Sequence, residues 1–163
     1  MERADVVIIG GGVVGLTIAY HLALTGACKV ILCERKTIGS GTSSMSGAMC
    51  GQQAEMTDTI SKLAVRALEI YENFDERVGG DPGFMNHGIL GFSPNVEAAD
   101  ARAEAARKNG STVNSLDLDG VAEFYSELNM EGYGAGVLYP KTGCVDSYQT
   151  MQAYAAQARR LGA

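Results

Sequence analysis

A glycine-rich turn between a strand and a helix constrains this chain more than any other feature. Residues 4–9 form an apolar run rich in valine and isoleucine, which predicts a strand buried on both faces of a parallel sheet. Gly10, Gly12 and Gly15 follow with G-x-G-x-x-G spacing, and a helical pattern begins at once. Such glycines allow a tight turn, close approach of a pyrophosphate, and close packing of the helix on the strand. A dinucleotide diphosphate would then lie at the helix N-terminus.

The second predicted strand ends on an acidic residue at the spacing that such a site requires. Gly26 is placed to end the helix, and residues 29–33 predict a strand that leads into Glu34. An acidic side chain about 20 residues after the glycines accepts hydrogen bonds from the adenosine ribose hydroxyls. Glu34 would repel a 2′-phosphate, which disfavours NADP. The alternative is a glycine-rich turn beside a surface glutamate. It does not explain why strand, glycines, helix, second strand and acidic residue all occur at the spacing of a dinucleotide site.

Composition fits a soluble globular domain and excludes several classes of partner. The chain has 163 residues, of which 46% are hydrophobic and 20% charged, and its net charge is −6. This acidic balance argues against nucleic acid or an anionic membrane as a partner. The apolar stretch 4–33 contains Asp5, His21 and Lys29. A buried strand and helix therefore explain it better than a signal peptide or a transmembrane segment.

The cysteines and histidines predict neither a disulfide framework nor a metal site. The cysteines are Cys28, Cys33, Cys50 and Cys144. They form no C-x-x-C pair, so we expect free thiols in a reducing compartment, the cytoplasm. The histidines, His21 and His87, have no neighbours at metal-ligand spacing.

Two further segments continue the predicted nucleotide-binding part. Residues 39–51 are mostly small or carry hydroxyls, which suits close backbone approach and hydrogen bonding to phosphate oxygens, although a flexible connector is the alternative. Apolar residues from Ile60 to Val78 then recur at helical spacing. We expect that face to be core, with Thr57 or Asp58 as the helix cap.

Residues 84–140 predict strands separated by helices, without the glycine-rich turn of the nucleotide-binding part. This pattern suggests an inserted α+β region. A short strand is predicted at 88–92, and Ser93-Pro94 has the residue types of an N-cap and first helical position for a helix that ends at Asn109-Gly110. A short helix at 119–128, a strand at 134–139 and a turn at 140–143 follow.

The last predicted helix begins at a capping box formed by Asp146 and Gln149, and Gly162 can end it. A doubly wound nucleotide-binding sheet needs at least a third parallel strand, whereas the sequence offers two. We therefore expect an incomplete domain.

These residues resemble the FAD-dependent D-amino-acid-oxidase superfamily, and within it the group of glycine oxidase, sarcosine oxidase and amino-acid dehydrogenases. The similar segments run along the whole chain. They are residues 6–16, 32–35, 38–44, 47–49, 51–55, 88–90, 136–146 and 154–163.

The resemblance implies an α/β fold: a Rossmann-like FAD-binding domain, incomplete here, with part of an inserted α+β substrate domain. Residues 1–80 would form the N-terminal part of the FAD-binding domain, 81–143 the substrate-domain segment, and 144–163 the helix that returns to the FAD-binding domain.

The resemblance also implies which residues bind FAD. They are Gly10, Gly12, Val13, Val14, Gly15, Glu34, Arg35, Thr42, Ser43, Ser44, Gly47 and Met49. The glycines would hold the diphosphate and Glu34 the adenosine ribose, with Arg35 near the adenine. Residues 42–44 and 47–49 would reach the diphosphate, the ribityl chain and the flavin ring. Met45 stands where some members attach FAD covalently through a histidine.

The implied chemistry is oxidation of a small-molecule amine or amino acid. A hydride passes from the substrate Cα to flavin N5, and the imine is then hydrolysed. The family's substrate-carboxylate anchor and C-terminal flavin-binding loop have no counterpart in the chain, so no catalytic residue is assigned. Tyr133, Tyr139 and His87 are interpreted as structural.

Two other functions stay open. The chain could be a truncated, non-catalytic nucleotide-binding module that relies on a partner subunit or a C-terminal part for the missing strands. The same fold could instead bind NAD, but simple NAD domains have no counterpart to residues 39–51.

Overall fold

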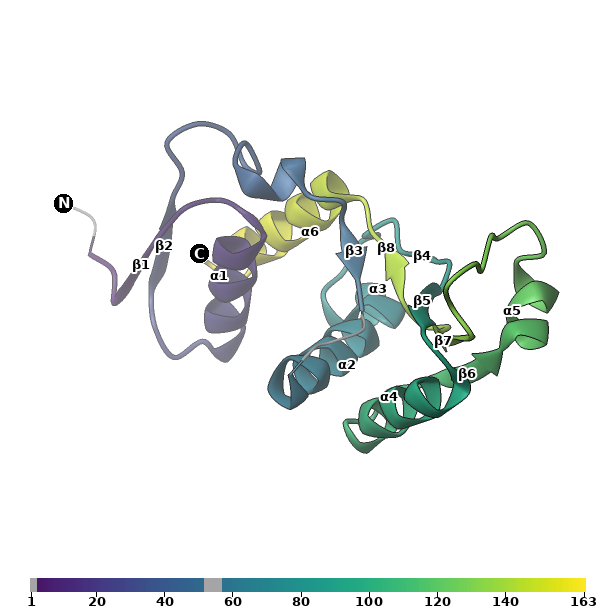
Figure 1. The fold of residues 1–163 in the computed structure, drawn as a ribbon. Coiled ribbons are helices and arrows are strands. Elements are labelled where there is room, and N and C mark those ends of the chain that lie inside the picture. Colours follow the sequence, from purple (N-terminus) through teal and green to yellow (C-terminus); the bar gives the residue numbers. More distant parts are fainter. Residues whose placement is uncertain (1–2, 52–56) are drawn as a thin grey trace. The chain divides into compact units, whose positions relative to one another are not determined.

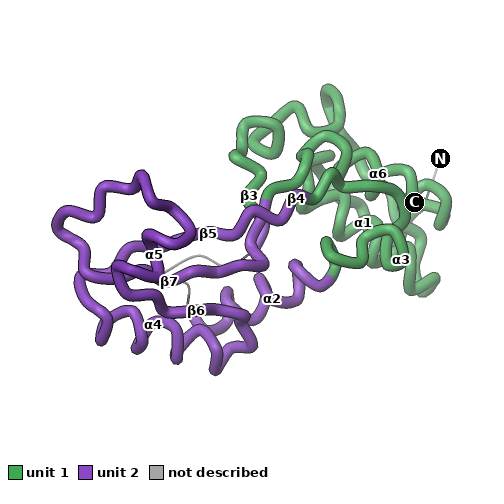
Figure 2. Tube along the Cα trace, turned by 90° about the vertical axis from the view of Figure 1, so that its right-hand side faces the viewer, with its two compact units in different colours: residues 1–49, 70–84, 144–163 green, residues 50–69, 85–143 purple. Residues whose placement is uncertain are grey.

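Residues 3–51 and 57–163 are described by a computed structural model, and the chain divides into two compact units (Figures 1 and 2). Unit 1 comprises residues 1–49, 70–84 and 144–163, and unit 2 comprises residues 50–69 and 85–143. The sequence-based division placed residues 50–69 with the FAD-binding part, whereas their contacts group them with unit 2. That division into domains stays a prediction.

Unit 1 contains the predicted strand–helix–strand arrangement. Strand β1 (Val6–Ile9) is followed by helix α1 (Val13–Thr25) and strand β2 (Val30–Cys33). The two strands are parallel and pair in register from Val6 opposite Val30 to Ile9 opposite Cys33. Gly26 ends α1 in the left-handed conformation, with φ +62°, as predicted.

Helix α6 (Ser147–Arg160) packs against α1 and completes the core of unit 1. The predicted N-cap is confirmed, because the Gln149 N–H donates to Asp146 Oδ1 at 2.9 Å. The short helix α3 (Phe74–Arg77) is tied to α1 by the Tyr20 hydroxyl, which donates to the Arg77 carbonyl at 2.6 Å. The buried residues of this core are Leu16, Ala19, Tyr20, Val30, Phe74, Val78, Met151, Tyr154, Ala155 and Ala158.

Strand β1 is covered on one face, so the prediction of burial on both faces is wrong for the described residues. Ile8 packs against the core of unit 1. Val7 and Ile9 point the other way, and they are 58% and 91% exposed. An apolar run predicts a strand that can be buried on both sides, but the described part of unit 1 covers one side.

The long predicted helix is interrupted. Helix α2 (Asp58–Glu72) ends before Asn73, whose φ of −124° and ψ of 36° are not helical. Thr57 caps α2, because its Oγ1 accepts from the Ile60 N–H at 3.4 Å. The apolar face is not wholly core, since Ile60 and Leu63 are 48% and 61% exposed. Helical periodicity defines a face, but the elements packed against it decide its burial.

Unit 2 is a three-stranded antiparallel sheet with a helix on it. Strand β7 (Ala135–Tyr139) lies between β5 (Ile89–Ser93) and β6 (Asn114–Asp117), and helix α4 (Val96–Lys108) packs on this sheet. All of β7 is buried. The core consists of Ala99, Ala103, Val113, Ala135, Val137 and Tyr139.

The N-cap of α4 is Asn95, not the predicted Ser93-Pro94. Asn95 Oδ1 accepts from the Ala98 N–H at 2.8 Å. Ser93 is instead the buried last residue of β5, where its Oγ accepts from Arg102 at 3.1 Å. Pairing with β7 therefore extends the strand to Ser93, the position at which the sequence predicted a helix cap.

Several short elements were not predicted or lie slightly elsewhere. Strand β6 was missed. So were β3 (Met49–Cys50), β4 (Met85–Asn86) and β8 (Gly143–Cys144), which form a sheet in the order β3-β8-β4. Helix α5 (Leu118–Phe124) corresponds to the helix predicted at 119–128. Among the residues that the structure describes, none of the helices has the length and apolarity needed to cross a membrane.

Gly39 lies in the left-handed region, with φ +78°, and a Cβ there would overlap Met151 Cε in the core. We predict that Gly39→Ala lowers the free energy of unfolding by about 1–3 kcal/mol, because the backbone is strained and Met151 has to shift. The matched control is Gly41→Ala, where a Cβ meets nothing within 4 Å and φ is −98°. Urea unfolding measures both. Equal midpoints for the two variants would contradict the prediction.

Candidate functional site

The site begins where strand β1 turns into helix α1. Gly10 has φ +112°, and its N–H donates to the Cys33 carbonyl at 2.8 Å. A Cβ on Gly15 would overlap the Gly10 carbonyl oxygen. Only glycine at position 15 therefore lets the first turn of α1 sit this close to the strand end, as the glycine spacing predicts.

The N-terminus of α1 is met by a hydroxyl from a distant segment. Gly12 is the N-cap and offers no side chain. The Val13 N–H instead donates to Ser43 Oγ at 3.1 Å. A Cβ at Gly12 would lie 3.0 Å from the same oxygen. This places bare backbone, a serine hydroxyl and the positive end of a helix dipole together, a combination that suits a phosphate group.

Glu34 faces the glycine loop. Its Oε2 accepts from the Gly11 N–H at 2.8 Å, and its Oε1 accepts from the Lys36 N–H at 2.8 Å. These bonds, the one from Gly11 foremost, lower the pKa of the Glu34 carboxyl. The ionised carboxylate keeps lone pairs for further donors such as ribose hydroxyls.

The segment after β2 is held to the glycine loop at its start. The Gly39 N–H donates to the Gly11 carbonyl at 2.9 Å. A 3₁₀ turn, η1 (Thr42–Met45), then places Ser43 at α1, while Ser44 Oγ donates to the Gly41 carbonyl at 3.0 Å.

The structure thus brings one half of the predicted residues together and leaves the other half on the surface. Gathered at the glycine loop are Gly10, Gly12, Val13, Gly15, Glu34 and Ser43. Exposed are Val14, Arg35, Thr42, Ser44, Gly47 and Met49. Of the similar segment 51–55, residues 52–55 lie outside the described residues.

Gly11 and Gly39 take part in the site but were not predicted. Gly11 occupies the first x position of the G-x-G-x-x-G pattern, where any residue is allowed. A Cβ at this position would nevertheless lie 3.1 Å from Glu34 Cβ. The unbroken run of three glycines at 10–12 was the signal that position 11 also needs close approach. Nothing in the local sequence indicates that Gly39 contacts Gly11, since the two are 28 positions apart.

Of the side chains set aside as structural, Tyr139 is buried, whereas Tyr133 is 47% exposed. Tyr139 is buried in β7, and burial raises the pKa of its hydroxyl. The Tyr133 ring lies against Phe92, with 5.0 Å between the ring centroids. His87 is exposed beside β4.

Comparison with known proteins identifies this arrangement. Residues 5–163 match the DAO family, described as FAD-dependent oxidoreductases. The chain belongs to this family. FAD is the cofactor of the family, so the resemblance seen in the sequence is confirmed, as is the fold class.

Three similar proteins are named as oxidases or dehydrogenases of an amino acid or of its methylated form. Mitochondrial dimethylglycine dehydrogenase of Rattus norvegicus is 30% identical over 164 residues, which are 99% of this chain and 19% of the relative. Glycine oxidase of Geobacillus kaustophilus is 32% identical over 172 residues, covering 99% of this chain and 45% of the relative. The crystal structure of L-proline dehydrogenase from P. horikoshii superposes with a TM-score of 0.84 at 27% identity, covering 99% of this chain and 43% of that one. The chain thus spans less than half the length of these proteins.

The lowered pKa of Glu34 predicts a pH dependence of stability. A carboxyl whose folded-state pKa is lowered stabilises the fold above the ordinary glutamate value, about 4.3, and loses that contribution as the pH falls through the folded-state pKa. We expect wild type to be more stable than Glu34→Gln at about pH 7, and the difference to shrink toward about pH 3. Thermal unfolding of both proteins across this range tests it. A difference that stays constant with pH would show that the carboxylate charge is not involved.

Proposed function

We propose that this chain binds FAD as the FAD-binding portion of an oxidoreductase that oxidises an amine or amino acid of the glycine, sarcosine, proline or D-amino-acid type. Membership of the DAO family supports the cofactor. The names of the relatives support the substrate class, since glycine, dimethylglycine and proline each carry an amine nitrogen on the carbon next to a carboxylate.

The observation that carries the proposal is the position of Ser43 and Glu34 around the glycine loop. In this proposal the diphosphate lies at the N-terminus of α1, where Gly12 has no side chain and the Ser43 hydroxyl, bonded by the Val13 N–H, is close by. Glu34 takes the adenosine ribose, and Arg35 lies near the adenine. Thr42, Ser43 and Ser44 reach the diphosphate, while Gly47 and Met49 lie toward the flavin.

The bound cofactor would supply the redox chemistry, by accepting the hydride that leaves the substrate carbon beside the amine nitrogen. The residues of this chain would bind and orient it. The glycine loop neutralises diphosphate charge with backbone donors, and Glu34 discriminates against a phosphate on the ribose. The remaining strands of the sheet and the substrate anchor would come from further chain or from a partner subunit. We place the protein in the cytoplasm.

The competing proposal, an NAD-binding domain, predicts no role for the segment that follows β2. Here this segment contributes Ser43 to the α1 N-terminus and the Gly39 N–H to the Gly11 carbonyl. These contacts favour a cofactor that extends over the segment. A non-catalytic nucleotide-binding module would share these contacts and differ by lacking turnover.

We predict that Gly12→Val abolishes FAD binding in the full-length protein, because the added side chain meets Ser43 and fills the space for the diphosphate. Ala105→Val, on the exposed face of α4 in unit 2, is the matched control and should keep the cofactor. The visible absorption spectrum of each purified protein gives the ratio of flavin to protein. Stoichiometric flavin in Gly12→Val would contradict the assigned role. A colourless wild type that is stabilised by NAD and not by FAD would contradict the cofactor.

A further inference from the structure

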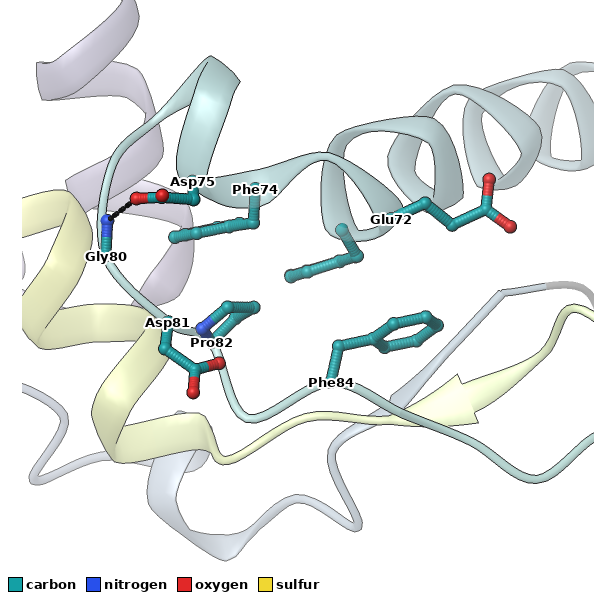
Figure 3. A pocket seen from close by; sticks show the side chains of 8 residues that line it. Glu72, Phe74, Asp75, Gly80, Asp81, Pro82 and Phe84 are labelled. Carbon is teal, nitrogen blue, oxygen red and sulfur yellow. Dashed lines mark hydrogen bonds between the residues drawn. The ribbon is translucent and has the colours of Figure 1, made fainter.

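A pocket lies in unit 1, away from the glycine loop, with which it shares no residue. It has a volume of about 530 Å³ and is formed by residues between 71 and 84, from the end of α2 through α3 and the following loop (Figure 3). This volume is within the range of small-molecule sites in proteins, about 300–1,000 Å³. Its lining combines aromatic rings with carboxylates.

The aromatic part of the lining is held in place by packing. The Tyr71 ring stacks on Phe74 at 6.0 Å and 6°, and on Phe84 at 6.0 Å and 21°. Phe74 is 2% exposed and its ring is fixed from the side by Tyr154, at 5.4 Å. Figure 3 shows Phe74 and Phe84 on opposite sides of the hollow, with Pro82 beside them. The partly exposed Tyr71 and Phe84 rings are therefore held in place before a ligand binds, while the buried Phe74 ring supports Tyr71 from the core.

The charged residues that line the pocket are all acidic: Glu72, Asp75 and Asp81. Backbone hydrogen bonds fix two of them. Asp75 Oδ1 accepts from the Gly80 N–H at 3.0 Å, and Asp81 Oδ1 accepts from the Gly83 N–H at 2.7 Å. Each of these carboxylates keeps its second oxygen for another donor. The described lining residues thus carry three negative charges and no positive one.

We propose that this pocket binds a small alkylated ammonium ion. Ring faces attract a cation within about 6 Å of the ring centroid, and their apolar surface packs against its methyl groups. The carboxylates exclude anions such as phosphates and attract positive charge. A bare metal ion fits less well, because the described residues contain no group of three His, Cys, Asp or Glu side chains that could hold one. A neutral apolar ligand would gain nothing from the Asp75 and Asp81 carboxylates.

The test uses tetramethylammonium as the probe and the whole 163-residue chain. Titration at constant ionic strength, followed by the chemical shifts of aromatic ring protons, should show saturable binding that moves tyrosine and phenylalanine resonances. Neopentyl alcohol, which is similar in size but neutral, should bind about 3- to 10-fold more weakly. This comparison uses only the wild-type chain, so it does not depend on the folding of any variant.

The variant that tests the charges is the double substitution Asp75→Asn and Asp81→Asn. Each asparagine keeps an oxygen for the Gly80 or Gly83 N–H, so the loop retains its hydrogen bonds. We expect the double variant to bind tetramethylammonium about 3- to 10-fold more weakly. The control is Glu76→Gln, on the same helix α3 but outside the lining, which should bind as wild type does.

Three results would overturn the proposal. They are the absence of saturable binding to the folded chain, equal affinity for neopentyl alcohol and tetramethylammonium, and equal affinity of the double variant and Glu76→Gln. None of them bears on FAD binding, since the two sites have no residue in common.

Discussion

The contact between Gly15 and the Gly10 carbonyl is the constraint on which the candidate site depends. A side chain at position 15 would overlap that oxygen, so α1 starts directly over the end of β1 only because both residues are glycines. This approach sets the first N–H groups of α1 beside the strand ends. It also brings Glu34, at the end of the parallel neighbour β2, within hydrogen-bond distance of Gly11. A shift of the helix would separate the two groups that a dinucleotide needs together.

Segment 39–49 completes the site by long-range contacts rather than by local structure. Gly39 contributes an N–H to the Gly11 carbonyl, and Ser43 contributes an oxygen to Val13. Gly39 can approach because it lies in the left-handed region and has no Cβ to meet Met151. The same core methionine of α6 therefore limits the position of this segment. The packing of α6 on α1 and the geometry of the candidate phosphate site at the α1 N-terminus are thus physically linked.

Sequence patterns predicted those parts of the structure that local chemistry determines. Each of these parts is recognised from a short run of neighbouring residues. They are the strands and helix of the β1–α1–β2 unit, the left-handed Gly26 and the Asp146 cap. The patterns missed what distant partners decide. The two-residue strands β3, β4 and β8 are too short to show periodicity, and Ser93 became a strand residue because it pairs with β7. Exposure of Ile9 and Leu63 could not be inferred, since burial depends on which elements lie opposite.

The acidity of the chain and its proposed anionic ligand are compatible because they act at different ranges. The net charge of −6 makes a field that salt screens within a Debye length of about 8 Å at physiological ionic strength. The glycine loop acts at hydrogen-bond distance, where backbone N–H groups and the helix dipole need no basic side chain to hold a phosphate. Glu34 stands beside these donors and accepts a hydrogen bond from one of them. Its charge is therefore offset locally, while in the proposed complex it would still repel a further phosphate on the ribose. In the proposed site, the placement of backbone donors, rather than net charge, would therefore determine which anion binds.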